Sequence, residues 1–218
     1  MARMLFEKTG QAIWISHLDL MRLFQRAFKR AGLHLKHTQG FNPRPSVSIA
    51  LPLSVGGESC CELLDFELDG QDVPPEQIRD GLNRALVAGV RVLRVYDDGR
   101  KLKELALLQC RVVLTYDAGV PVGAGEAISA LFAQPSVIVD KRGKTGVTQQ
   151  NIVPMIRRLQ VEQREKQIWI EARICCQNPS LNPMQLCAAV ERYLPELRPD
   201  FAQCCRLELF DTQENIFR

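Results

Sequence analysis

The stretch SHLDLMRLFQRAFKRAG, residues 16–32, decides how the sequence is interpreted. Ser16 is typical of a helix N-cap, and Asp19 follows three residues later, where a carboxylate favours the positive end of the helix dipole. Apolar side chains recur every three or four positions from Leu20 to Ala31 and form one broad face. Gly32 is typical of the residue that ends a helix. The stretch therefore predicts an amphipathic helix.

The opposite face of this helix is basic, since it carries Arg22, Arg26, Lys29 and Arg30. Residues 1–50 hold eight Lys and Arg against two Asp and Glu, a balance of +6, whereas residues 51–218 have a balance of −3. A local basic surface attracts phosphate at moderate salt. The alternative, which the sequence leaves equally open, is a helix face that is merely solvated.

Outward from the helix, residues 1–99 show strand and helix patterns in the order β-α-β-β-α-β. Two prolines, Pro74 and Pro75, open the second helix. This order predicts a ferredoxin-like unit, in which a four-stranded antiparallel sheet carries two helices on one face. The predicted strands are Arg3–Glu7, Ser46–Leu53, Cys61–Leu68 and Val90–Tyr96.

The second half, residues 104–218, repeats that order after a polar, turn-rich boundary at 97–103. We therefore predict an α+β protein of two tandem ferredoxin-like (βαββαβ) units with antiparallel sheets. A basic and polar insert, residues 141–166, lies between the two middle strands, where we expect a functional loop. The predicted elements are strands Leu108–Tyr116, Ser136–Asp140, Gln167–Cys175 and Cys205–Phe210, and helices Gly125–Ala133 and Pro183–Tyr193.

The composition, 46% hydrophobic and 24% charged, is that of a soluble globular protein. No apolar run reaches the eighteen or so residues of a membrane span, and the N-terminal residues do not form an apolar signal core. We expect a cytoplasmic protein that does not contact membranes. The eight Cys show no C-x2-C spacing and include three adjacent pairs, which chelate poorly because neighbours on a strand face opposite sides. We therefore expect buried, reduced thiols and neither a metal nor another cofactor.

The three histidines, His17, His34 and His37, all lie in the basic segment. They could supply the acid and base of a metal-independent ribonuclease or a metal site, but the sequence favours hydrogen bonding or phosphate contact. Motifs of nucleotide hydrolysis, dinucleotide binding and the common hydrolases are absent. We therefore favour a protein that is not an enzyme.

The loop QGFNPRP, residues 39–45, is the most informative local feature. Two prolines stiffen it, Gly40 permits a bend, and Phe41 with Arg44 offers an aromatic ring and a planar cation. Stacking on bases and contact with phosphates require those residue types. The alternative is a rigid connection with Phe41 in the core.

Four segments of the N-terminal region carry a resemblance to a known family: ISHLDLMR (15–22), RAGL (30–33), QGFNPRP (39–45) and LPLSVG (51–56). They resemble the bacterial radical-SAM-linked family, a domain of unknown function found alone or at the C-terminus of cobalamin-binding radical SAM proteins. Residues 151–159, with Arg157, are similar to a second, weaker motif of that family. The resemblance implies partnership with a radical SAM enzyme rather than radical chemistry in this chain, and it supplies no catalytic residues.

Two functions follow as expectations. The first is a non-catalytic accessory protein that recognises RNA or a protein substrate for a radical SAM partner. The second is a metal-independent RNA endonuclease of the repeat-associated, tandem ferredoxin-like type, using His17 with His34 or His37, although the glycine-rich C-terminal loop of those enzymes is absent. For the first function, the expected contact residues are His17, Asp19, Arg22, Arg26, Lys29, Gln39, Phe41, Asn42, Arg44 and Arg157.

Overall fold

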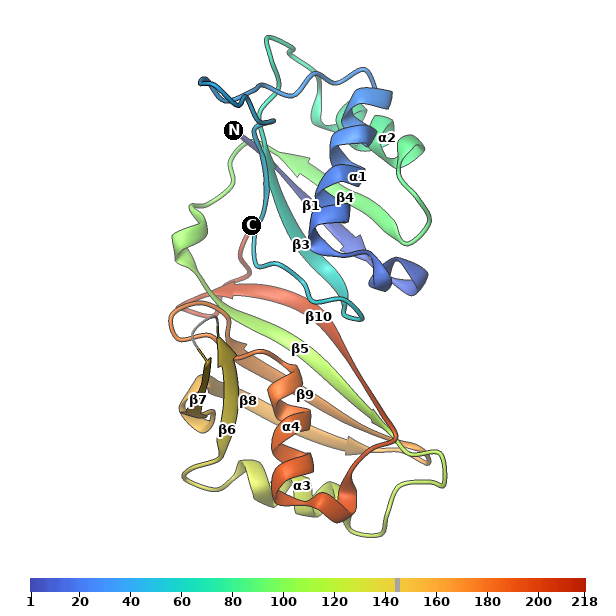
Figure 1. The fold of residues 1–218 in the computed structure, drawn as a ribbon, viewed down its shortest axis with the longest axis vertical. Coiled ribbons are helices and arrows are strands. Elements are labelled where there is room, and N and C mark those ends of the chain that lie inside the picture. The colour runs from blue at the N-terminus through green and yellow to red at the C-terminus, as the bar shows by residue number, and fades with distance from the viewer. Residues whose placement is uncertain (144–145) are drawn as a thin grey trace. The chain divides into compact units, whose positions relative to one another are not determined.

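The protein is mixed α+β (Figure 1). The computed structural model describes residues 1–143 and 146–218. These residues divide into two compact units, Met1–Glu104 with Arg218, and Leu105–Phe217. Each unit combines antiparallel strands with two α-helices. The predicted α+β class is therefore confirmed.

Unit 1, residues 1–104 with Arg218, has the strand order β4-β1-β3-β2, with all neighbours antiparallel. Strand β2 is shorter than predicted because Pro45 precedes it and Leu51, with a φ of +49°, turns the chain soon after it. The elements are β1 (Ala2–Lys8), η1 (Gly10–Trp14), α1 (His17–Arg30), β2 (Val47–Ile49), β3 (Glu58–Phe66), α2 (Pro75–Ala85), β4 (Val90–Tyr96) and η2 (Leu102–Glu104).

Helix α1 begins and ends as predicted. The Asp19 amide donates to the Ser16 hydroxyl at 3.2 Å, and that hydroxyl donates to the Asp19 carboxylate at 2.7 Å. Gly32 follows the helix with a φ of +71°, which glycine adopts without strain. The apolar face is buried, and Phe24 meets Phe6 of β1 edge to face, with ring centroids 4.8 Å apart. Burial of each such ring contributes about 1.5–3 kcal/mol.

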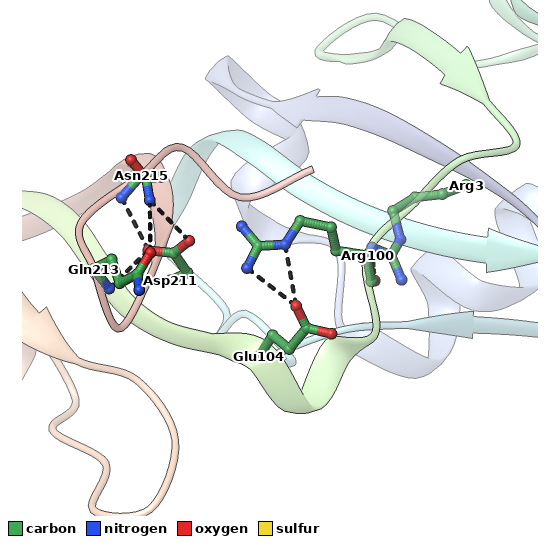
Figure 2. Close-up of polar contacts among 6 residues, drawn as sticks. All are labelled: Arg3, Arg100, Glu104, Asp211, Gln213 and Asn215. Atoms are coloured by element: carbon green, nitrogen blue, oxygen red, sulfur yellow. Dashed lines mark hydrogen bonds and ion pairs between the residues drawn. The ribbon is translucent and has the colours of Figure 1, made fainter.

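The segment after β4 is held on unit 1 through Arg3, which is 5% exposed (Figure 2). The Arg3 guanidinium donates to Asp65 at 2.6 and 3.0 Å and to the Arg100 carbonyl at 2.7 Å. A Cβ added at Gly99 would lie 3.2 Å from that guanidinium, so only glycine fits there without displacement. The Arg100 amide in turn donates to the Arg218 carbonyl at 2.9 Å. Residues 99–100 are therefore anchored rather than loose.

Unit 2, residues 105–217, has the strand order β10-β5-β9-β8, again with antiparallel neighbours. Strands β6 and β7 form a separate two-stranded hairpin. The elements are β5 (Leu105–Thr115), α3 (Ala124–Phe132), β6 (Ile138–Gly143), β7 (Gly146–Asn151), η3 (Val153–Met155), β8 (Ile156–Gln163), β9 (Gln167–Cys175), α4 (Met184–Tyr193), η4 (Pro195–Leu197) and β10 (Phe201–Asp211).

The predicted strand at Ser136–Asp140 is present as β6 (Ile138–Gly143), but its predicted place in the sheet is wrong. Ser136–Asp140 does not pair with Gln167–Cys175, because β6 pairs with β7, and β8 takes the place beside β9. Strand β8 lies inside the predicted insert, 141–166, of which residues 144–145 lie outside the described residues. A bulge between Ile156 and Arg158 interrupts the alternation of apolar and polar residues in β8. The sequence of β8 therefore lacks the regular period of two that identifies a strand.

Candidate nucleic-acid interface

The α1 basic face, defined by Arg22, Arg26 and Lys29, is exposed along its length. The three positions are spaced i, i+4 and i+7, so they follow one side of the helix over about 10 Å. Arg22 pairs with Asp19 at 3.0 Å, but both side chains are more than 60% exposed, and such pairs contribute little. Within the described residues, Arg26 and Lys29 form no ion pair. This face therefore keeps most of its positive charge available to an anion.

The Asp19 carboxylate lies at the start of this face. Its pKa is lowered, first by the hydrogen bond from Ser16 and then by the hydrogen bond from Arg22. The ionised carboxylate stabilises the positive, N-terminal end of the helix dipole. The contacts of Asp19 are therefore explained by helix capping, without a role in binding.

The QGFNPRP loop, residues 39–45, stands on a short ladder of backbone hydrogen bonds. The Thr38 amide donates to the Arg44 carbonyl at 2.8 Å, and the Ser46 amide donates to the Lys36 carbonyl at 2.7 Å. Phe41 is fully exposed, so the alternative that placed its ring in the core is wrong. Gln39, Asn42 and Arg44 are also exposed. The loop thus presents an aromatic ring and a guanidinium to solvent on a braced stem.

The histidines do not form one site. His17 is the first residue of α1, whereas His34 follows its last residue by four positions. The helix between them is about 20 Å long. His37 lies on the loop stem, where its backbone pairs with Pro45. The structure therefore does not bring His17 to either of the others, and the described residues contain no group of three His, Cys, Asp or Glu that could hold a metal ion.

Arg157 lies in unit 2, on the exposed side of β8. It lines a cavity of about 280 Å³ whose other walls include Phe132 and Val153. The remaining predicted contact residues all belong to unit 1, where they form two groups: the α1 face and the loop with its stem.

Sequence reasoning missed an aromatic and cationic group on the sheet of unit 2. The Arg111 guanidinium lies 4.1 Å from the ring centroid of Trp169, and that of Arg164 lies 3.3 Å from it. Trp169 alternates with Ile168 and Ile170, which are fully buried, so its side chain is on the other face of β9. That alternation was the available signal, but the partner Arg111 is 58 positions away along the chain.

The buried Asp211 carboxylate is fully accounted for by hydrogen bonds within its own turn (Figure 2). One carboxylate oxygen accepts from the amides of Gln213 and Asn215 at 2.8 and 2.9 Å, and the other accepts from the Asn215 side chain at 3.3 Å. A side chain that satisfies the donors of its own turn is a common device of loop architecture. We therefore assign Asp211 a structural role in stabilising this turn.

Several thiols are too buried to react readily. Burial raises the pKa of Cys176 to about 12 and those of Cys187 and Cys204 to about 11. The pKa of Cys110 is also raised well above its usual value by burial. The thiolate is the reactive form, so these four side chains act as apolar packing groups at neutral pH.

Membrane insertion through a helix finds no support in the described part of the chain, where no helix is both long and apolar enough to cross a bilayer.

Comparisons with known proteins identify a family and little else. No curated protein matches the chain. A chain of a Cbf5-Nop10-Gar1 complex is similar in fold, with a TM-score of 0.50 and 9% identity, and the match covers 95% of this chain but only 48% of that one. A protein from Galdieria sulphuraria matches over 94% of this chain and 96% of that chain, at 12% identity and a TM-score of 0.27.

The family assignment comes from the sequence. Residues 2–183, which include the N-terminal segments and the second motif described above, match the model of a family described as an uncharacterized protein conserved in bacteria (DUF2344). The match spans far more than half of the chain. The protein therefore belongs to this bacterial family, DUF2344.

Proposed function

We propose that the protein binds RNA as a non-catalytic recognition protein, with the α1 basic face and the QGFNPRP loop as its contact surfaces. The observation that carries the proposal is the α1 basic face itself. Arg22, Arg26 and Lys29 lie in the open on one side of a well-capped helix, and only Arg22 has an ion-pair partner among the described residues. Cations displayed in this way bind phosphates and release the counterions condensed on the nucleic acid.

The loop adds a second kind of contact. Phe41 can stack on an unpaired base, and Arg44 can stack or donate to a phosphate. Both side chains are exposed, and the hydrogen bonds of the stem restrict the loop backbone, so less backbone entropy is lost when they bind. Catalysis is not part of the proposal, because α1 separates His17 from His34.

Charge reversal tests the proposal. Arg22→Glu combined with Arg26→Glu should weaken binding of a single-stranded RNA in fluorescence anisotropy at about 50 mM salt. It should also flatten the plot of log affinity against log salt by about 0.7 for each phosphate that the variant no longer neutralises. Helix α1 should remain folded, because exposed substitutions usually change stability by less than about 0.5 kcal/mol.

The matched control is Lys101→Glu combined with Lys103→Glu, which makes the same change of charge at two exposed positions outside α1. This control should retain nearly all of the affinity and salt dependence. An equal loss of affinity in both double variants would show that only net charge matters. Wild-type protein without salt-dependent RNA affinity would refute the proposal.

Two further proposals concern the fold and the partner. We interpret each unit as ferredoxin-like, which the strand orders β4-β1-β3-β2 and β10-β5-β9-β8 support. We also propose a radical SAM enzyme as partner, on the resemblance of the N-terminal segments alone, and a cytoplasmic location, on composition.

Co-purification with a co-expressed cobalamin-binding radical SAM enzyme tests the proposed partnership. Loss of co-purification in the Arg22→Glu, Arg26→Glu variant would place the contact on α1.

A further inference from the structure

One face of the unit 2 sheet carries polar and aromatic side chains instead of a helix layer. Val112, Ile170 and Ala172 are buried, so the side on which they lie is covered. Arg111, Trp169 and Glu171 occupy the alternate positions and point to the other side. The register sets Arg111 opposite Glu171 and Val113 opposite Trp169. Side chains from β5 and β9 therefore meet on the open side of the sheet.

Ion pairs hold the guanidinium groups over the Trp169 ring. The Arg111 Nε donates to Glu171 at 2.8 Å, and the Arg164 Nε donates to Glu162 at 3.0 Å. The Trp169 indole Nε1 donates to the Gln167 side chain at 2.9 Å. These contacts favour the stacked arrangement before any ligand arrives, while the Arg164 side chain remains 44% exposed.

A second aromatic ring belongs to the same side of the sheet. Phe201, at the start of β10, pairs with Thr115, and Thr115 pairs with Gln167. Directly paired residues share a face, so Phe201 and Gln167 lie on the side that carries Trp169. The Phe201 side chain is 55% exposed, so its ring is accessible on this side of the sheet.

We propose that the Trp169 face, defined by Arg111, Arg164, Trp169 and Phe201, is a stacking surface for the bases of single-stranded nucleic acid. The inference rests on the proposed function and deepens it: the α1 basic face binds phosphates, and the Trp169 face binds bases. Unpaired bases stack on aromatic rings and on guanidinium planes.

The charges of the Trp169 face favour bases over phosphates. Each guanidinium over the ring already has a carboxylate partner, Glu171 for Arg111 and Glu162 for Arg164, so the net charge of this group is about zero. Because both guanidinium groups lie over the ring, 4.1 and 3.3 Å from its centroid, the plane that this group offers to a base is that of the exposed Arg164 guanidinium. The electrically neutral group offers little to a phosphate backbone. A duplex keeps its bases stacked internally and should not bind here.

Tryptophan fluorescence tests the inference directly, because the chain has only two Trp, Trp14 and Trp169. In a Trp14→Phe variant of the full chain, a single-stranded RNA ten-mer should quench the emission of Trp169. An abasic ten-mer with the same backbone and an RNA duplex should leave it unchanged. Quenching by the abasic strand would refute stacking of bases as the cause.

Substitutions separate stacking from phosphate contact. Trp169→Ala should weaken single-stranded RNA binding about tenfold with an unchanged salt slope, whereas Trp169→Phe should keep most of the affinity. Trp14→Ala, an equal truncation of an exposed Trp in unit 1, is the matched control and should have no such effect. Thermal unfolding of each variant verifies that it is folded.

The outcomes also distinguish this inference from the proposed function. Salt-dependent RNA binding without quenching of Trp169 would refute the inference and leave the α1 basic face as the binding surface. If the protein binds no RNA, the proposed function fails, and titration with adenosine monophosphate then decides whether Trp169 stacks on a base at all. Unchanged Trp169 emission with saturating nucleotide would refute the inference.

Discussion

Two surfaces, the α1 basic face in unit 1 and the Trp169 face in unit 2, place basic side chains in opposite electrostatic settings. In unit 1, Arg26 and Lys29 extend from a helix without an ion-pair partner in the described residues, whereas in unit 2, Arg111 and Arg164 are paired with glutamates and lie over an indole ring. The first arrangement keeps positive charge available. The second cancels charge and orders flat surfaces. Counting Lys and Arg would not separate the two, and the carboxylate neighbours are what distinguish them.

Arg3 of unit 1 differs from the arginines of both surfaces, because it is both ion-paired and buried. Arg3→Met should have the largest effect on stability, a loss of about 3 kcal/mol, since it removes the cation from the Asp65 carboxylate, whose side chain is only 12% exposed. Urea unfolding followed by circular dichroism measures the change.

The double variant Arg3→Met, Asp65→Leu is the control for that prediction. Removing both charges should recover most of the lost stability, because no unpaired ion remains in the interior. If the double variant is as unstable as Arg3→Met, packing rather than charge explains the role of Arg3.

Helix capping gives the next effect and compares serines in helices of the two units. Ser16→Ala should cost about 1 kcal/mol, because it removes the acceptor for the Asp19 amide. Ser129→Ala, in α3, should cost less than about 0.5 kcal/mol, since its exposed hydroxyl only donates to the Gly125 carbonyl within the helix. Equal losses of stability in urea unfolding would argue against the capping role of Ser16.

The paired arginines of unit 2 should contribute less to stability. Arg164→Ala should change the free energy of unfolding by about 1 kcal/mol or less, because its side chain and that of Glu162 are largely exposed. In the Trp14→Phe background it should nevertheless alter the emission of Trp169, since one guanidinium leaves the ring. Unchanged emission would show that Arg164 does not stack on the ring in solution.

The smallest effect concerns pH and the start of α1. The lowered pKa of Asp19 means that its carboxylate stabilises the folded protein above the unfolded-state value of about 4 and loses that contribution as the pH falls through the lower folded-state value. The stability difference between wild-type protein and Asp19→Asn should therefore shrink on acidification. A difference that grows below pH 4 would contradict the assignment.

The elements that could be predicted from the sequence are those that neighbouring residues determine. The start of α1, its buried face and its end follow from neighbouring residues, and all three are confirmed by the contacts of Ser16, Phe24 and Gly32. Strand β8 was missed because a bulge interrupts its alternation, while the apolar residues of 136–140 suggested a strand in the sheet. A bulge is set by pairing with β9, which the sequence of β8 does not reveal.

The two proposed binding surfaces differ in the same way, because one depends on neighbouring residues and the other on residues far apart in the sequence. The α1 basic face was predicted because helical spacing alone collects Arg22, Arg26 and Lys29. The Trp169 face was not, since Arg111 and Trp169 come together only through the register of β5 with β9. The exposure of Phe41 was one of two open alternatives, because loop sequence does not determine whether a ring packs inward.

The hydrogen bond between Arg100 and Arg218 has a consequence for truncation of the chain. Unit 1 comprises residues 1–104 together with Arg218, whose carbonyl accepts from the Arg100 amide. A fragment that ends at Glu104 therefore keeps the contact of the Arg100 carbonyl with Arg3 but loses the acceptor that Arg218 supplies to the Arg100 amide. Residues 99–100 should consequently be held less firmly in such a fragment than in the whole chain.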